Sequence, residues 1–291
     1  MRNNKKSWRK GLTMPVKHIR GVDIVYEILG DSGPWVTVTP GGRRGMDSER
    51  PLATLIAEAG FRVLIHDRRL IGASGIAFAG NNESREQAED LLALMKALGI
   101  DQAYIAGSSS GARMSILLAQ YHPDAVKALL LWRVTGGPYA AQRLAFNYYE
   151  QYLDAVNKGG IDAVLATDHF KAMTKANPTT EETLRNMGAD GFRAGMQAWL
   201  DGFCLDRDYP VAGISPENMR KITLPSIVIP GNDRVHPRAP GQAAHRLLSN
   251  SIYDEVLTEE VDQDVDFAGW ERMTGTLAAR FIDFLRAQER G

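Results

Sequence analysis

One pentapeptide constrains this chain more than any other part of its sequence: a Gly-x-Ser-x-Gly motif at 107–111, centred on Ser109. The apolar segment 103–106 precedes it, and the helix-forming segment 110–121 follows it. A serine at such a strand-to-helix turn sits in a strained backbone conformation, and larger side chains at the glycine positions would clash. The motif therefore predicts an α/β protein with a nucleophile-type serine at the end of a strand.

Strand and helix patterns alternate along the rest of the chain, which favours a mostly parallel sheet with helices on both faces. The residues Gly30 to Pro34 indicate a hairpin turn between the first two strands. Alternating or continuous apolar runs predict strands at 22–28, 35–39, 62–66, 103–106, 128–132, 226–229 and 252–256. Amphipathic spacing predicts helices at 51–59, 84–98, 110–121, 141–157, 192–203, 241–248 and 270–288.

The pattern divides the chain into a core, an insertion and a tail. Residues 136–222 contain aromatic-rich helical segments and no convincing strand, so we expect a helical cap inserted between strands of a core formed by 16–135 and 223–291. The basic segment 1–15 lacks the apolar region of a signal peptide and is expected to be a disordered tail.

Composition limits the classes of partner. The formal net charge of -1 over 291 residues provides no overall field for nucleic acid or an anionic membrane surface. No apolar run approaches the roughly 20 residues that span a bilayer, and Cys204, the single cysteine, cannot form an intrachain disulfide. We therefore expect a cytoplasmic protein that acts on a small molecule. The oligomeric state is not decided by the sequence, and a homodimer stays open.

No motif for a cofactor or a metal is present. The glycines at 107 and 111 do not have dinucleotide-binding spacing, there is no phosphate-loop lysine, and no histidine or cysteine cluster has metal-ligand spacing. The sequence predicts cofactor-free chemistry.

A second glycine-rich loop follows the predicted strand at 35–39. Its residues Gly41 and Gly42 would let a backbone N-H face the site with no side chain in the way. We expect the N-H of Gly42 or Arg43 to form one half of an oxyanion hole and the N-H of Ser110 to form the other half. Arg43 and Arg44 in the same loop are candidates for binding an anionic substrate, with a carboxylate as the favoured group, or else solvated surface arginines.

Four segments together resemble the α/β-hydrolase fold superfamily from about residue 22 onward: the glycine turn at 41–42, the Asp-x-Arg-x-x-Gly-x-Ser pattern at 67–74, the Ser109 elbow, and the loop 230–237. The resemblance implies a sheet of the α/β-hydrolase type with an inserted cap. It implies Ser109 as the nucleophile and Asp233 as the carboxylate that orients the base.

The sequence departs from this family at the base. Members take a histidine from the loop after the last strand, but here that loop is acidic, with Asp262, Asp264 and Asp266. His236 follows Asp233 by three residues in the same loop and is our first candidate for a relocated base, provided that its ring lies within about 3 Å of the Ser109 hydroxyl.

Two alternatives for the base stay open. His66, at the end of a predicted strand, is the first, although a role in ordering the neighbouring loop suits it better. The three aspartates of the acidic loop are the second, but a carboxylate is a poor base for serine near neutral pH unless burial raises its pKa.

Three functions remain open from the sequence. The first is hydrolysis of a small ester, lactone, thioester or carbonyl compound through an acyl-enzyme on Ser109. The second is a lyase or isomerase reaction on the same scaffold. The third is ligand binding without turnover, because the resembling family includes receptors that lost the triad histidine.

The cap and the strand ends supply candidates for substrate contacts. We expect Trp132 and Arg133 to face the pocket floor, His66 to reach the site, and Tyr149 and Trp199 to contribute to its roof. The aromatic residues of the cap favour an apolar or aromatic ligand body; they are Phe146, Tyr148, Tyr149, Tyr152, Phe170, Phe192, Trp199 and Phe203.

Overall fold

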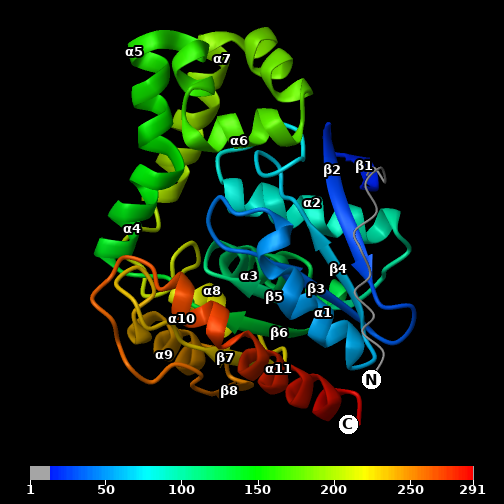
Figure 1. Cartoon of the computed structure of the whole chain (residues 1–291). Helices are drawn as coiled ribbons and strands as arrows, with labels where there is room; N and C mark the ends of the chain where they lie inside the picture. The colour runs from blue at the N-terminus through cyan, green and yellow to red at the C-terminus, as the bar shows by residue number, and fades with distance from the viewer. Residues whose placement is uncertain (1–13, 291) are drawn as a thin grey trace.

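A single eight-stranded sheet, in the order β1-β2-β4-β3-β5-β6-β7-β8, forms the centre of this computed structural model, in which residues 14–290 are described (Figure 1). β2 is antiparallel to both β1 and β4, and the other neighbouring strands are parallel. The basic residues predicted to form a disordered tail lie outside the described range. The strands are β1 (Val16–Ile19), β2 (Val22–Leu29), β3 (Trp35–Thr39), β4 (Arg62–His66), β5 (Ala103–Ser108), β6 (Val126–Trp132), β7 (Ser226–Ile229) and β8 (Ser251–Tyr253).

The predicted hairpin between β2 and β3 is wrong. β2 pairs with β4, with Tyr26 opposite His66, whereas β3 lies between β4 and β5 and is parallel to both. Val36 and Val38 of β3 are fully buried, so this strand belongs in the interior of the sheet. The turn at 30–34 therefore carries the chain from β2, the second strand of the sheet, past β4 to the central position of β3. The short edge strand β1 was not predicted, because three of its four residues are exposed and give no burial pattern.

Helices cover both faces of the sheet. On one face α1 (Arg50–Glu58), α10 (Phe267–Arg272) and α11 (Thr274–Gln288) bury residues such as Ile56 and Phe281. On the other face α2 (Glu83–Ala97), α3 (Ser110–Tyr121), α8 (Pro216–Arg220) and α9 (Arg238–Leu247) bury residues such as Leu91 and Leu117. Short 3-10 turns, η1 (Met46–Glu49) and η2 (Pro123–Ala125), precede α1 and β6.

A block of helices stands between β6 and β7 in the chain and at one end of the molecule (Figure 1). It consists of α4 (Pro138–Ala145), a π-helical turn η3 (Phe146–Glu150), α5 (Gln151–Leu165), α6 (Asp168–Ala176) and α7 (Thr179–Cys204). Its own apolar cluster includes Phe170, Phe192 and Trp199, and also takes in Leu70 and Val235 from loops of the core. α6 was not predicted, and α7 begins earlier than the predicted helix at 192–203.

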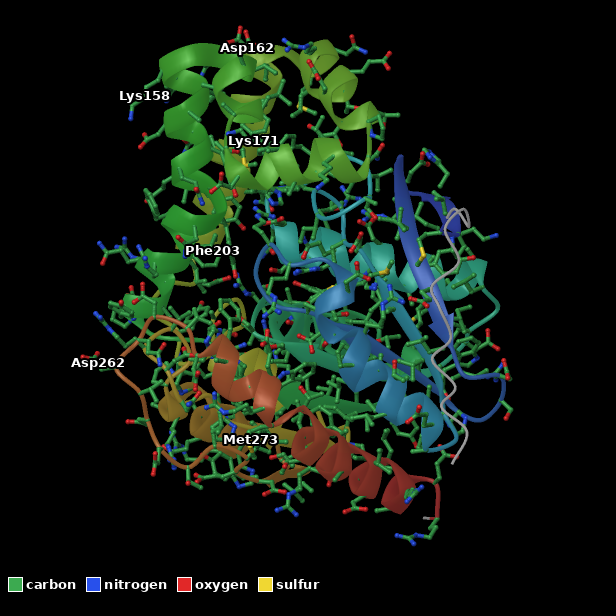
Figure 2. The ribbon with its side chains drawn as sticks, in the orientation of Figure 1. Lys158, Asp162, Lys171, Phe203, Asp262 and Met273 are labelled. Atoms are coloured by element: carbon green, nitrogen blue, oxygen red, sulfur yellow. The ribbon has the colours of Figure 1, made fainter. Side chains whose placement is uncertain are left out.

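The side chains show how this block meets the core. Lys158 and Asp162 lie at its outer end, whereas Phe203 lies at its base (Figure 2). There the guanidinium of Arg113, on α3, stacks 4.7 Å from the centre of the Phe203 ring. The loops at the carboxyl ends of the strands are therefore enclosed between the sheet and the helical block, which is where ligands bind in sheets of this kind.

Candidate active site

Ser109 occupies the turn between β5 and α3 in a strained backbone conformation, with φ of 53° and ψ of -115°. The two flanking glycines are required by close approach of the backbone. A Cβ at Gly107 would lie 2.3 Å from the carbonyl oxygen of Gly111, and a Cβ at Gly111 would lie 2.4 Å from that of Thr39. The sequence folds this way because only glycine fits at both positions, and the turn presents the serine hydroxyl beyond the end of the strand.

Three side chains from two loops form a chain of hydrogen bonds. The hydroxyl Oγ of Ser109 lies 2.9 Å from Nε2 of His236, and Nδ1 of His236 lies 2.7 Å from Oδ1 of Asp233. All three residues are buried, at 5%, 4% and 3% exposure in that order. With Nδ1 protonated, the ring donates to Asp233 and its Nε2 accepts the serine proton.

Asp233 is held by more than the histidine ring. Its Oδ1 also accepts the backbone N-H of His236 at 2.8 Å, so one oxygen closes the turn and orients the imidazole. Its Oδ2 accepts the backbone N-H of Asp266 at 2.9 Å and a hydrogen bond from Nη2 of Arg133 at 3.3 Å. A spacing of three residues is therefore enough for a carboxylate and an imidazole in one loop to act as a unit.

The electrostatics of the loop favour a neutral imidazole and a charged carboxylate. Burial and the nearby Arg133 guanidinium lower the pKa of His236 to about 4, against the opposing effect of Asp233. Burial alone would raise the pKa of Asp233, but its hydrogen bonds from His236 and Asp266 and the charge of Arg133 hold it below its usual value. At neutral pH the ring is thus free to accept a proton.

The other candidates for the base are placed differently. Neither ring nitrogen of His66 has a hydrogen-bond partner in the described part of the chain, and burial lowers the pKa of this side chain to about 3. Asp262 is exposed at the outer edge of its loop (Figure 2), and Asp264 accepts hydrogen bonds from Tyr139 and Arg143. Asp266 caps α10 by accepting the N-H of Gly269 at 2.8 Å. Across residues 14–290, the hydrogen bond to the Ser109 hydroxyl comes from His236.

The glycine loop after β3 passes directly over the serine. A Cβ at Gly41 would lie 2.8 Å from the Cβ of Ser109 and 3.4 Å from its Oγ. Ser110 is the first residue of α3, so its backbone N-H has no partner within the helix. The geometry therefore brings together the two segments whose amides, those of Ser110 and of Gly42 or Arg43, we expected to form an oxyanion hole.

The two arginines of this loop have different environments. Arg43 forms a close ion pair with Glu83 and donates to the carbonyl oxygen of Tyr148 at 2.8 Å. Its charge is therefore compensated by Glu83, although Arg43 lines the cavity above Ser109, and its contact with an anionic substrate stays a prediction. Arg44 stacks 4.6 Å from the centre of the Phe267 ring, and its guanidinium forms no ion pair with any residue from 14 to 290. Of the two, Arg44 is the one available to an anion.

A cavity of about 370 Å³ opens above Ser109 and His236. Arg44, Arg133 and Glu49 share one part of its wall, and burial raises the pKa of Glu49 to about 7 against the opposing charges of the two arginines. The remaining wall includes residues of α4 to α6 and of the loops; these are Leu144, Asn147, Tyr148, Gln151, Tyr152, Asp168, His169, Val235, Val265 and Phe267.

Four residues expected to contact substrate lie outside the lining of this cavity. His66 is buried in β4, and Trp132 packs edge-on against Phe281 beneath the sheet, with ring centres 5.4 Å apart. Tyr149 donates to Glu83 at 2.8 Å, and Trp199 donates from its indole N-H to the carbonyl oxygen of Ala79 at 2.9 Å. Tyr149 and Trp199 are held away from the cavity by partners distant in the sequence, and His66 and Trp132 are buried in the core.

The cavity residues that the sequence analysis missed in this helix are Leu144, Asn147 and Gln151. With the cap aromatics Tyr148 and Tyr152 they recur at spacings of three and four, so all five share one face of the continuous helix formed by α4, η3 and α5. That spacing was visible in the sequence. What was not visible is that this face, rather than its neighbour bearing Tyr149, turns toward the serine.

No group of three or more potential metal ligands occurs within the described range 14–290. Over the same residues, no helix has the length and apolar character needed to cross a bilayer.

Comparison with known proteins agrees with this architecture. A family profile described as alpha/beta hydrolase fold matches residues 34–160. The structure also resembles the enol-lactonase from Burkholderia xenovorans LB400, with a TM-score of 0.62 and 21% sequence identity over 94% of this chain and 100% of that chain. The chain has the α/β-hydrolase fold.

Similarity to individual curated proteins is partial. Over 112 residues the chain is 30% identical to a 2-hydroxy-6-oxononadienedioate/2-hydroxy-6-oxononatrienedioate hydrolase of Burkholderia vietnamiensis, a match of 38% of this chain and 36% of that protein. Over 240 residues it is 24% identical to proline iminopeptidase of Clostridioides difficile, covering 75% of this chain and 80% of the relative. The chain spans less than half of the length of the curated relatives that it matches at 30% identity or more.

Proposed function

We propose that this protein hydrolyses a small ester, lactone, thioester or activated carbonyl compound through a covalent acyl-enzyme on Ser109. The observation that carries the proposal is the connected set of hydrogen bonds from Ser109 to His236 and from His236 to Asp233, at 2.9 and 2.7 Å, at the floor of a cavity. An oriented and neutral imidazole beside a serine hydroxyl is what nucleophilic catalysis by serine requires.

The proposed reaction has two halves. In the first, Ser109 Oγ attacks the substrate carbonyl, Nε2 of His236 accepts its proton, and Asp233 stabilises the imidazolium. The negative oxygen of the tetrahedral intermediate is bound by the N-H of Ser110 and that of Gly42 or Arg43, and His236 then protonates the leaving group. In the second half, His236 removes a proton from water, which attacks the acyl-enzyme; as the bond to Ser109 breaks, His236 returns that proton to Ser109 Oγ, which releases the acid and regenerates the free serine.

The cavity favours a small substrate that carries a carboxylate. The Arg44 guanidinium is free of ion pairs among residues 14–290 and lies in the same wall as Arg133. Aromatic and aliphatic side chains from the cap, such as Tyr152 and Leu144, provide apolar contact for the rest of the molecule. The name of one relative describes a hydrolase of dioates, and that of one solved neighbour describes an enol-lactonase, which is consistent with this class.

Turnover of a panel of short acyl esters, lactones and β-diketones, with and without a carboxylate, tests the proposal. We expect Ser109→Ala to abolish hydrolysis, and His236→Ala to reduce turnover by at least about a hundredfold, the lower range for general-base catalysis. His245→Ala is the matched control, because His245 forms a hydrogen bond with Ser251, neither residue lines the cavity, and the substitution should leave turnover unchanged. Full turnover by Ser109→Ala would refute the acyl-enzyme, and binding of a ligand without turnover by the wild type would favour a binding protein.

A further inference from the structure

Arg68 is a buried arginine with no part in the mechanism described so far. It follows β4 and Asp67, is 2% exposed, and lines no part of the cavity above Ser109. Its neighbour Arg69 forms an ion pair with Asp90, with Nη2 2.6 Å from Oδ1, and so is tied to α2. Arg68 instead extends toward the serine loop.

The guanidinium of Arg68 connects the two segments that flank Ser109. Its Nη2 donates to the carbonyl oxygen of Gly42 at 2.7 Å, and its Nη1 donates to Oγ of Ser110 at 3.0 Å. Nη1 also lies 3.3 Å from Oε1 of Gln87, on α2. The loop after β3 and the first turn of α3 are therefore held at a fixed separation by one rigid, planar group.

Both acceptors belong to residues adjoining or supplying the N-H donors of the proposed oxyanion hole. The Gly42 carbonyl is in the same peptide unit as the N-H of Arg43, and a hydrogen bond to a peptide oxygen polarises that peptide and strengthens its N-H as a donor. Ser110 contributes its own N-H to the other half of the hole. The Arg68 side chain thus orients both N-H donors, and it does so from outside the cavity lining, without contacting the substrate.

Arg68 acts here as a cation. Burial lowers its pKa to about 10, with Glu83 and Asp67 opposing the effect of burial, so the group stays charged at neutral pH. Hydrogen bonds from a charged donor are roughly twice as strong as neutral ones. A positive charge behind the peptide also favours the transition state, in which negative charge develops on the substrate oxygen.

We propose that Arg68 is a positioning residue for the oxyanion hole, holding the Gly42–Arg43 peptide and Ser110 at the geometry that binds the tetrahedral intermediate. The inference rests on the proposed serine hydrolase function. It predicts that loss of Arg68 weakens binding of the transition state and leaves binding of the ground-state substrate nearly unchanged.

The test compares Arg68→Met, which keeps much of the side-chain volume, with Arg68→Lys, which keeps the charge, using the best substrate found for the wild type. Direct loss of one oxyanion donor costs about a hundredfold to a thousandfold in kcat. For an indirect effect we expect a loss of about tenfold to a hundredfold in kcat for Arg68→Met, with KM within about threefold. Affinity for a boronic acid, which forms a tetrahedral adduct on the serine, should fall in parallel, and Arg68→Lys should recover part of both.

Ser110→Ala provides a second variant in case Arg68→Met does not fold. It removes the Oγ that accepts from Arg68 and keeps the backbone N-H, so we expect a loss of several-fold in kcat and in boronic acid affinity. Unchanged kcat and boronic acid affinity in these variants, or an effect on KM alone, would overturn the inference. If the wild type itself neither turns over any ester nor binds the boronic acid, the proposed function fails instead, so the two failures are distinct.

Discussion

Replacing Arg133 tests the electrostatic part of the mechanism. This residue directly follows β6, is 6% exposed, and places Nη2 3.3 Å from Oδ2 of Asp233 and 3.4 Å from Nδ1 of His236. Its charge stabilises the carboxylate and opposes protonation of the imidazole. Arg133→Met removes the charge and keeps an extended side chain in its place.

The size of the effect follows from the distances. The cationic charge is spread over the guanidinium and the imidazolium, so an effective separation of about 5 Å is a fair measure. At an effective dielectric constant of about 20, two unit charges at that separation interact by about 3 kcal/mol, which is equivalent to about 2 pKa units. The pKa of His236, lowered to about 4 in the wild type, should therefore rise to about 6 in Arg133→Met.

The acid limb of kcat/KM reports the pKa of the base in the free enzyme. With an uncharged ester as substrate, we expect the wild type to keep its kcat/KM down to about pH 5 and Arg133→Met to lose half of it near about pH 6. Arg133→Lys retains the charge and should resemble the wild type, and melting temperatures at each pH would show that all three proteins stay folded. An identical acid limb in Arg133→Met and wild type would refute the electrostatic role assigned to Arg133.

Two further predictions concern buried ionisable groups. The pKa of Glu49 is raised to about 7, so above that pH its negative charge offsets the positive charges of Arg44 and Arg133. Because these charges would attract a substrate carboxylate, KM for a carboxylate ester should rise about fivefold from pH 6 to 8 in the wild type. It should stay flat in Glu49→Gln, and a rise in that variant would contradict the assignment. The pKa of His66 is lowered to about 3 by burial, so its contribution to stability is complete above about pH 6.5 and is lost as the pH falls toward 3. The unfolding free energy, measured with urea between pH 6 and 4.5, should fall with decreasing pH less steeply in His66→Leu than in the wild type, by about 1.4 kcal/mol per pH unit. The same pH dependence in both proteins would exclude this role for His66.

The parts of the fold that the sequence predicted are those with a strong local pattern. Alternating apolar runs and helical spacing indicated seven of the eight strands in the described structure and the main covering helices, because burial on one or both faces leaves a clear period. β1 was not predicted because it is a short, exposed edge strand. The predicted β2–β3 hairpin was wrong because strand pairing depends on contacts between residues far apart in the sequence.

The site divides in the same way. Ser109 and Asp233 follow buried strands in recognisable turns, and His236 is close to Asp233 in the sequence, so the sequence alone was enough to propose all three as site residues. The sequence could not separate the roles of Arg43 and Arg44, because the partner that compensates Arg43 is Glu83, forty residues away on α2. Glu49, Asn147 and Gln151 were not predicted for the same reason, because the wall of a cavity is formed by tertiary contacts.

The measurement that tests the central claim most directly is labelling by a fluorophosphonate, read as intact protein mass, for the wild type, Ser109→Ala and His236→Ala. We expect one adduct on the wild type within minutes, none on Ser109→Ala, and much slower labelling of His236→Ala, because only a serine activated by its base reacts quickly. An unlabelled wild type, or equal labelling of Ser109→Ala, would contradict a nucleophilic Ser109 activated by His236.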